Sequence, residues 1–127
     1  SLLIFTAVVF VFSCTKNRNT GRCNTYFTIT LATTPPTTTV AAGITTIVKG
    51  YGYNGCYQFT GSEVTSGLAN TIEIRLKGTV PCEANICTDV LIGAIDTIKI
   101  PTLATGIYYL KFFSASALVK TDTVVVN

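Results

Sequence analysis

The chain has 127 residues, no histidine, no tryptophan and a formal net charge of +3 at pH 7. Without histidine, a Ser-His-Asp or Cys-His catalytic arrangement is excluded, because both use an imidazole as the general base. The excess positive charge lies near the start of the sequence, at Lys16, Arg18 and Arg22. From residue 24 onward six basic and six acidic side chains balance each other. A nucleic-acid-binding surface, which would have to be basic, is therefore not expected there.

Residues 2–12 form an apolar run with one polar residue, Thr6. A membrane-spanning helix needs about 20 apolar residues, whereas a run of about half that length is typical of the apolar core of a secretory signal peptide. We therefore expect residues 1–13 to be a signal peptide. Its start is truncated, because neither an initiator methionine nor a basic leader precedes the run. The alternative is a strand of the core with a buried free thiol at Cys14.

The end of the run, Val11-Phe12-Ser13-Cys14, resembles the lipobox of bacterial lipoproteins, with Phe12 in place of the usual small residue. The resemblance implies that Cys14 carries lipid on its sulfur and becomes the first residue of the mature protein. Residues 14–22 are then a lipidated cysteine and a flexible tether, and residues 23–127 are one domain. Thr15, rather than aspartate, follows the cysteine, which implies anchoring in the bacterial outer membrane, on either its periplasmic or its outer side.

Five cysteines are an odd number for an exported protein. If Cys14 carries lipid, the other four can form two disulfides, with three possible pairings. We favour the pairing in which Cys56 joins Cys87, so that Cys23 joins Cys82. The rival is a local Cys82–Cys87 bridge, which leaves Cys23 with Cys56. A zinc site made from the same four cysteines would need paired C-x-x-C arms, which are absent, so neither a metal nor a cofactor is expected.

After the tether, apolar and polar residues alternate in several short segments, which is the period of a strand with one buried face. In chain order the expected strands are residues 26–31, 40–49, 56–60, 71–77, 89–100, 108–113 and 118–126. Residues 61–70 and 78–87 are expected to be loops. In the first and fourth strands we expect the apolar residues to face the core: Phe27, Ile29, Leu31, Ile72, Ile74 and Leu76. The charged residues between those of the fourth strand should be solvated.

No 3.6-residue apolar pattern appears in the mature part, so the fold class is all-β, with an antiparallel β-sandwich favoured over a barrel. Leu103-x-x-Gly106-x-Tyr108 resembles the tyrosine corner of immunoglobulin-like domains. Gly55-Cys56-Tyr57 resembles a turn in small immunoglobulin-like lipoproteins of bacterial envelopes. The resemblance implies an antiparallel immunoglobulin-like β-sandwich of about seven strands. The plainer interpretation of Tyr108 is an ordinary core tyrosine.

Few residues offer catalytic chemistry. Glu63, Glu83 and Asp89 could form a carboxylate pair as in glycosidases, and Glu83 and Asp89 with Asn85 could bind calcium. The plainer interpretation is that these are solvated acids in or beside loops. No catalytic residue and no enzyme activity are therefore expected.

Three tyrosines near the Asn54-Gly55 turn form the candidate binding surface: Tyr51, Tyr53 and Tyr57. Exposed tyrosines provide a rigid, amphipathic contact surface for sugars or proteins. The alternative is that these rings cap the end of the core. Outward-facing Tyr109 and Phe113 could form a second patch.

The sequence thus predicts a non-catalytic, lipid-anchored immunoglobulin-like module of a bacterial envelope, with a binding or structural role. The alternative is a carbohydrate-binding accessory lipoprotein that uses the Tyr51/Tyr53 turn. The expected partners are the membrane, through the lipid anchor, and an envelope protein or glycan that the sequence does not identify.

Overall fold

The computed structural model describes residues 21–83 and 86–127. Over these residues the chain forms nine strands and no helix, which confirms the predicted all-β class. The strands are β1 (Arg22–Tyr26), β2 (Thr28–Thr33), β3 (Thr37–Thr38), β4 (Ile44–Gly52), β5 (Gln58–Ser66), β6 (Thr71–Pro81), β7 (Ile92–Ile100), β8 (Gly106–Ser114) and β9 (Ala117–Val126).

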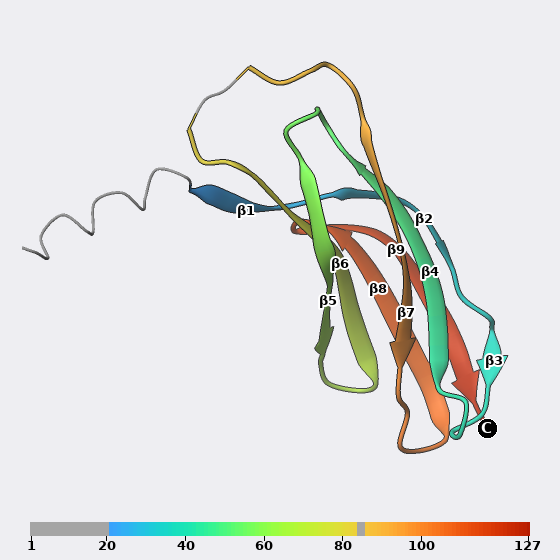
Figure 1. The fold of residues 1–127 in the computed structure, drawn as a ribbon. Coiled ribbons are helices and arrows are strands. Elements are labelled where there is room, and N and C mark those ends of the chain that lie inside the picture. The colour runs from blue at the N-terminus through green and yellow to red at the C-terminus, as the bar shows by residue number, and fades with distance from the viewer. Residues whose placement is uncertain (1–20, 84–85) are drawn as a thin grey trace, which may run out of the picture.

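The strands form two sheets that pack as a sandwich (Figure 1). The smaller sheet has the order β2-β4-β7. In the larger sheet β6 is central: β5 pairs with one of its edges, and β1 and β8 pair with different halves of the other. β9 and β3 continue the larger sheet beyond β8. The predicted sandwich is confirmed. Most of its strand pairings are antiparallel, and the β6–β8 and β3–β9 pairings are parallel.

The core lies between the two sheets and is built from the inward residues of β2, β4, β6, β7, β8 and β9. On β6 the predicted alternation is confirmed, because Ile72, Ile74 and Leu76 are buried. On β8 the buried residues are Leu110 and Phe112, while Tyr109 faces outward. The buried apolar residues are Phe27, Ile29, Ala32, Ile44, Val48, Ile72, Ile74, Leu76, Ile98, Ile100, Leu110, Phe112, Val124 and Val126.

The first predicted strand, residues 26–31, is wrong in detail, because the chain changes sheets within it. β1 pairs with β6 in the larger sheet, and β2 pairs with β4 in the smaller one. Phe27 lies at the crossing point, where its ring is buried and its backbone N–H donates to the Leu76 carbonyl at 2.8 Å. The register then shifts between Ile29 and Leu31. Leu31 is consequently half exposed, and Ala32 takes the predicted inward position.

Several predicted boundaries are also wrong. Residues 61–66 belong to β5 rather than to a loop, because β6 supplies a pairing partner even for this polar segment. Residues 40–43 form a turn before β4, and Gly43 adopts a positive φ of 73° there. β6 continues to Pro81, and β7 starts only at Ile92. The start of β3 follows Pro35-Pro36, where the chain returns to the larger sheet.

The charged face of β6 is less solvated than predicted, because Arg75 lies on the larger sheet rather than in water. Its guanidinium carbon is 4.4 Å from the centre of the Phe113 ring, a cation–π contact. Its Nε donates to the Ala115 carbonyl at 2.7 Å, and Nη1 forms an ion pair with Glu73 at 3.2 Å. The Arg75 side chain is only 18% exposed, so the proposed second aromatic patch is partly covered at Phe113.

Tyr108, at the start of β8, makes the contact expected of a tyrosine corner. Its hydroxyl donates to the backbone carbonyl of Ala104, four residues upstream, at 2.9 Å. The ring packs against the core while the hydroxyl group keeps a hydrogen-bond partner. This hydrogen bond holds the loop between β7 and β8 against the strand that follows it.

Candidate functional site

The two disulfides lie at one end of the sandwich and have the pairing favoured from the sequence. Cys23 is joined to Cys82, with a Cα–Cα distance of 4.9 Å, and Cys56 is joined to Cys87, at 5.4 Å. Cys23 lies on β1 and Cys82 directly follows β6, so the pairing of these strands brings the two residues together. All four sulfurs of the domain are therefore used in bonds to each other.

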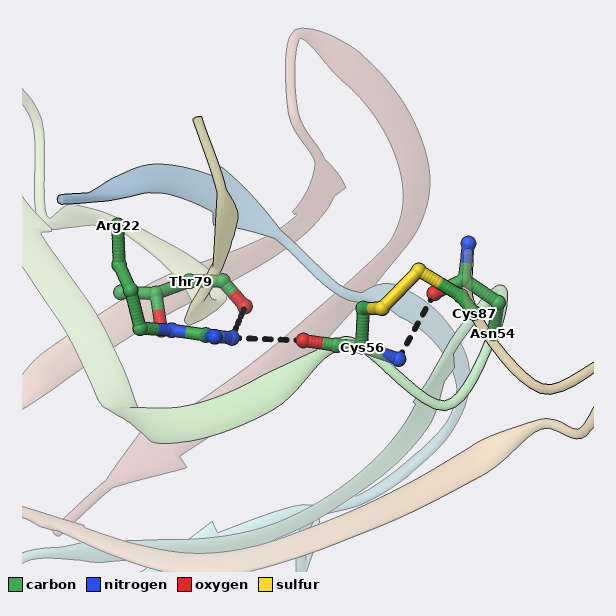
Figure 2. Close-up of a disulfide and its surroundings, with 5 residues drawn as sticks. All are labelled: Arg22, Asn54, Cys56, Thr79 and Cys87. Carbon is green, nitrogen blue, oxygen red and sulfur yellow. Dashed lines mark hydrogen bonds between the residues drawn. A yellow bond between two sulfur atoms is a disulfide. The ribbon is translucent and has the colours of Figure 1, made fainter. Parts of the chain in front are cut away.

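The second disulfide joins the turn after β4 to the loop that precedes β7 (Figure 2). Two hydrogen bonds support it: the Gly55 N–H donates to the Thr88 carbonyl at 2.9 Å, and the Cys56 N–H donates to Asn54 Oδ1 at 2.9 Å. The Asn54 contact is an Asx-type turn, which explains why Asn-Gly stands at this position. The predicted turn thus exists, and the disulfide holds it against the loop.

Arg22 connects the two disulfides, a role that the sequence analysis missed by assigning it to the tether. It is the first residue of β1 and precedes Cys23. Its Nη2 donates to the Cys56 carbonyl at 2.6 Å and to the Thr79 carbonyl at 3.1 Å, and its Nε donates to Thr79 Oγ1 at 3.0 Å (Figure 2). We call residues 21–23, 53–57, 79–83 and 86–91 the disulfide end.

Replacing Arg22 with lysine should lower the free energy of unfolding by about 1 kcal/mol. Lysine keeps the charge, but its single ammonium group cannot reproduce the fork that reaches Cys56 and Thr79 together. Urea unfolding of the oxidised protein measures the effect. Lys49→Arg, a swap at an exposed position of β4, is the control and should change stability by less than about 0.5 kcal/mol. Equal stability of Arg22→Lys and the wild type would contradict the role given to the guanidinium.

The three predicted tyrosines do lie together at this end. The rings of Tyr51 and Tyr53 meet edge to face with centroids 5.5 Å apart, and those of Tyr53 and Tyr57 lie 6.0 Å apart. Tyr57 also meets the buried ring of Phe27 at 5.5 Å. A Cβ atom on Gly52 would lie 2.5 Å from the Tyr57 ring, so glycine is required for this approach. Tyr57 therefore caps the core, as the plainer interpretation expects.

Tyr53 is the most exposed of these tyrosines, with 56% of its surface accessible. Its hydroxyl accepts a hydrogen bond from Thr28 Oγ1 at 2.9 Å, which fixes the ring on the edge of the smaller sheet. Tyr51 lies on β4 rather than in the turn, and it is half-buried. The contact surface offered to a ligand is thus made mainly by Tyr53 with the edge of Tyr51.

The candidate carboxylates are not assembled into a site. Glu63 lies on β5, where it accepts a hydrogen bond from the Tyr26 hydroxyl at 3.2 Å. Glu83 and Asp89 are exposed residues of the loop before β7. Within residues 21–83 and 86–127, no group of three or more cysteine or acidic side chains could hold a metal ion. Asn85, the third proposed calcium ligand, lies outside the described residues.

Two shallow hollows occur at the opposite end of the sandwich, on either side of residues 100–102. One, of about 380 Å³, lies between residues 40–43 and 99–102. The other, of about 330 Å³, lies between the β5–β6 turn and the loop before β8. Among charged side chains only Lys99 lines either hollow. Within the described residues, neither hollow therefore gathers a group of charged side chains that could fix an ionic ligand.

The sequence analysis also missed an exposed apolar loop at the disulfide end. Ile86, Val90 and Leu91 precede β7 and expose their side chains. Val90 and Leu91 were expected to lie in a strand over residues 89–100, but β7 starts only at Ile92 and leaves both in the loop. Cys14 and the rest of the proposed signal peptide and tether up to residue 20 lie outside the described residues. The part of the chain that is described contains no helix able to cross a membrane.

The chain was compared with known families, curated proteins and solved structures. The model of one family, the ORF11 beta-sandwich domain, matches residues 46–125. This range starts within β4 and stops one residue before the end of β9, so it includes strands of both sheets and three of the four bonded cysteines. No curated protein and no solved structure was found to match. Because the match covers more than half of the sequence and agrees with the observed fold, the chain belongs to the ORF11 beta-sandwich domain family.

Proposed function

We propose that the chain is a non-catalytic, lipid-anchored immunoglobulin-like module of a bacterial envelope, attached through Cys14. The observation that carries the proposal is the use of the cysteines. The two disulfides account for Cys23, Cys56, Cys82 and Cys87, and the fifth cysteine directly follows the apolar run of residues 2–12. A lipidated Cys14 explains both the odd count and the lipobox-like residues before it.

The binding or structural role is supported by the rigidity of the disulfide end. Two disulfides, the Arg22 fork and the edge-to-face tyrosines hold its turn and loop in place. A rigid surface loses little conformational entropy when a partner binds. The proposed location is the outer membrane, which the residue after the cysteine, Thr15, favours by resemblance to enterobacterial lipoproteins.

Fatty-acid labelling in the bacterium that makes this protein tests the anchor. With an alkyne fatty acid in the medium, the wild type should take up the label and fractionate with outer membranes. Cys14→Ser should lose both properties, because no other thiol is available for lipid. The double variant Cys56→Ser/Cys87→Ser is the control and should keep the label. An unlabelled wild type, or a labelled Cys14→Ser variant, overturns the proposal.

A carbohydrate-binding role is the second candidate, and the exposed ring of Tyr53 favours it. Aromatic faces of this kind stack on sugar rings. On a glycan array the wild type would bind a glycan that Tyr51→Ala/Tyr53→Ala does not bind. Tyr57 is left unchanged because it packs on the core. The absence of any glycan signal, or a signal that survives both substitutions, removes this candidate.

A further inference from the structure

The loop before β7 exposes three apolar side chains close together in sequence. Ile86 is 97% exposed, Leu91 is 64% exposed and Val90 is 50% exposed. We call these three residues the apolar loop. Isolated exposed apolar residues are common on protein surfaces, but three within six residues, next to a disulfide that holds the loop in position, form a local apolar protrusion.

The apolar loop lies at the end of the sandwich where the N-terminal segment enters. Cys82 is bonded to Cys23, and its N–H lies 3.5 Å from the Gly21 carbonyl. The loop is held to the tyrosine turn by the Cys56–Cys87 disulfide. In Figure 1 the loop and β1 lie at the same end, whereas the β5–β6 turn and the β7–β8 loop lie at the other.

The length of the tether decides which end faces the membrane. Eight residue steps separate Cys14 from Arg22, and an extended chain spans at most about 3.6 Å per residue, or about 29 Å in all. β6 has 11 residues, which at about 3.4 Å each make it about 37 Å long. Leu68 and Leu103 are also well exposed. They belong to the β5–β6 turn and the β7–β8 loop, which lie at the opposite end (Figure 1). A tether fixed at the disulfide end would have to run back along the whole sandwich to bring them to the bilayer.

We propose that the apolar loop is a second membrane contact, which inserts Ile86, Val90 and Leu91 into the interfacial layer of the bilayer that holds the lipid anchor. This inference rests on the proposed anchoring through Cys14. The turn after β4 is joined to the loop by the hydrogen bond from the Gly55 N–H to the Thr88 carbonyl. This turn carries the exposed Tyr53, and tyrosine is enriched at membrane interfaces. Glu83 precedes the loop and Asp89 lies within it, next to Val90, and both are exposed. Their carboxylates stay at the level of the headgroups, because a charged group is costly to bury in the hydrocarbon layer. The insertion is therefore shallow, and it fixes the orientation of the domain on the membrane.

Tryptophan fluorescence tests the contact cleanly, because the chain contains no tryptophan. Leu91→Trp places the probe in the apolar loop, and Leu103→Trp places it at the opposite end, on a side chain that is 94% exposed. Both full-length lipidated variants are reconstituted into phosphatidylethanolamine–phosphatidylglycerol vesicles that contain brominated lipid. The expected result is a blue shift and strong quenching for Leu91→Trp and an unchanged emission for Leu103→Trp.

The outcomes separate the loop contact from the anchor. If both variants float with the vesicles and neither is quenched, the anchor holds and the loop contact is wrong. If the purified protein carries no lipid, Cys14 is coupled to a maleimide phospholipid in the vesicles, and the same two readings decide whether the loop inserts. A concentration-dependent blue shift of Leu91→Trp without vesicles shows that a second copy covers the loop, and this result also overturns the membrane contact.

Discussion

Replacing Phe112 with alanine is expected to lower the free energy of unfolding by about 3–5 kcal/mol. The Phe112 side chain is fully buried in the middle of β8, opposite Ile74 of β6. Truncation removes the buried ring and leaves a cavity between the two sheets, which the surrounding side chains can fill only in part. Because small domains are stable by about 5–15 kcal/mol, the loss should appear as a large decrease in the urea midpoint of unfolding.

Phe113 is the matched control, because it is the next residue along β8 and faces the other side of the larger sheet. Its ring lies under the Arg75 guanidinium. Phe113→Ala should lose this cation–π contact and some apolar burial, about 1 kcal/mol in total. If Phe113→Ala were as destabilising as Phe112→Ala, the inward and outward faces of β8 would be assigned wrongly.

Replacing Cys23 and Cys82 together with serine should lower the free energy of unfolding by about 4 kcal/mol in the chain-entropy model. The bond spans 59 residues, so its loss releases nearly half of the 127-residue unfolded chain from a constraint. The Cys56–Cys87 bond spans 31 residues, and its removal should lower stability by slightly less, about 3.5 kcal/mol. Denaturant unfolding of the two double variants, compared with the oxidised wild type, measures both effects.

The reduced wild type is the control for the serine side chains. It should resemble a protein that lacks both bonds and be less stable than either double variant. If a double variant were within about 0.5 kcal/mol of the wild type, a range typical of surface substitutions, the corresponding disulfide would not form in solution.

The sandwich and its central strands could be predicted because their burial follows a local rule. On β6 the alternation of Ile72, Ile74 and Leu76 with charged residues specifies which face is buried, whatever its neighbours are. β8 and the second half of β9 follow the same period, whereas the first five residues of β9 are all exposed. The turn at Asn54-Gly55 could be placed because both residues favour a turn locally. The Asn54 side chain can accept a hydrogen bond from a nearby backbone N–H, and Gly55 has a flexible backbone.

The remaining features of the fold depend on contacts between residues far apart in the sequence. The local alternation of apolar and polar residues does not indicate such contacts. β5 is polar, and it is a strand because β6 pairs with it. The crossing at Phe27 and the register shift before Leu31 arise because one run of residues serves two sheets. The parallel β6–β8 pairing likewise depends on the order of the strands in the sheet, which the residues of a single strand do not indicate.

For the candidate site, sequence reasoning identified the cysteines and the tyrosines but missed how they are connected. The tyrosine cluster could be anticipated because its members lie within seven residues of each other. The contact of Arg22 with the Cys56 carbonyl spans 34 residues. The contact depends on the pairing of β1 with β6, which places Arg22 at this end of the sheet. The apolar loop was missed because Val90 and Leu91 were expected to belong to a strand over residues 89–100, whereas β7 starts only at Ile92.

The most direct test of the whole account is the intact mass of the protein isolated from bacterial membranes, before and after reduction and alkylation. The account predicts a chain that begins at Cys14, carries fatty acyl groups on that residue, and gains four alkyl groups only after reduction. A chain that keeps residues 1–13 and carries no acyl group, or one whose domain cysteines are alkylated without reduction, would contradict it.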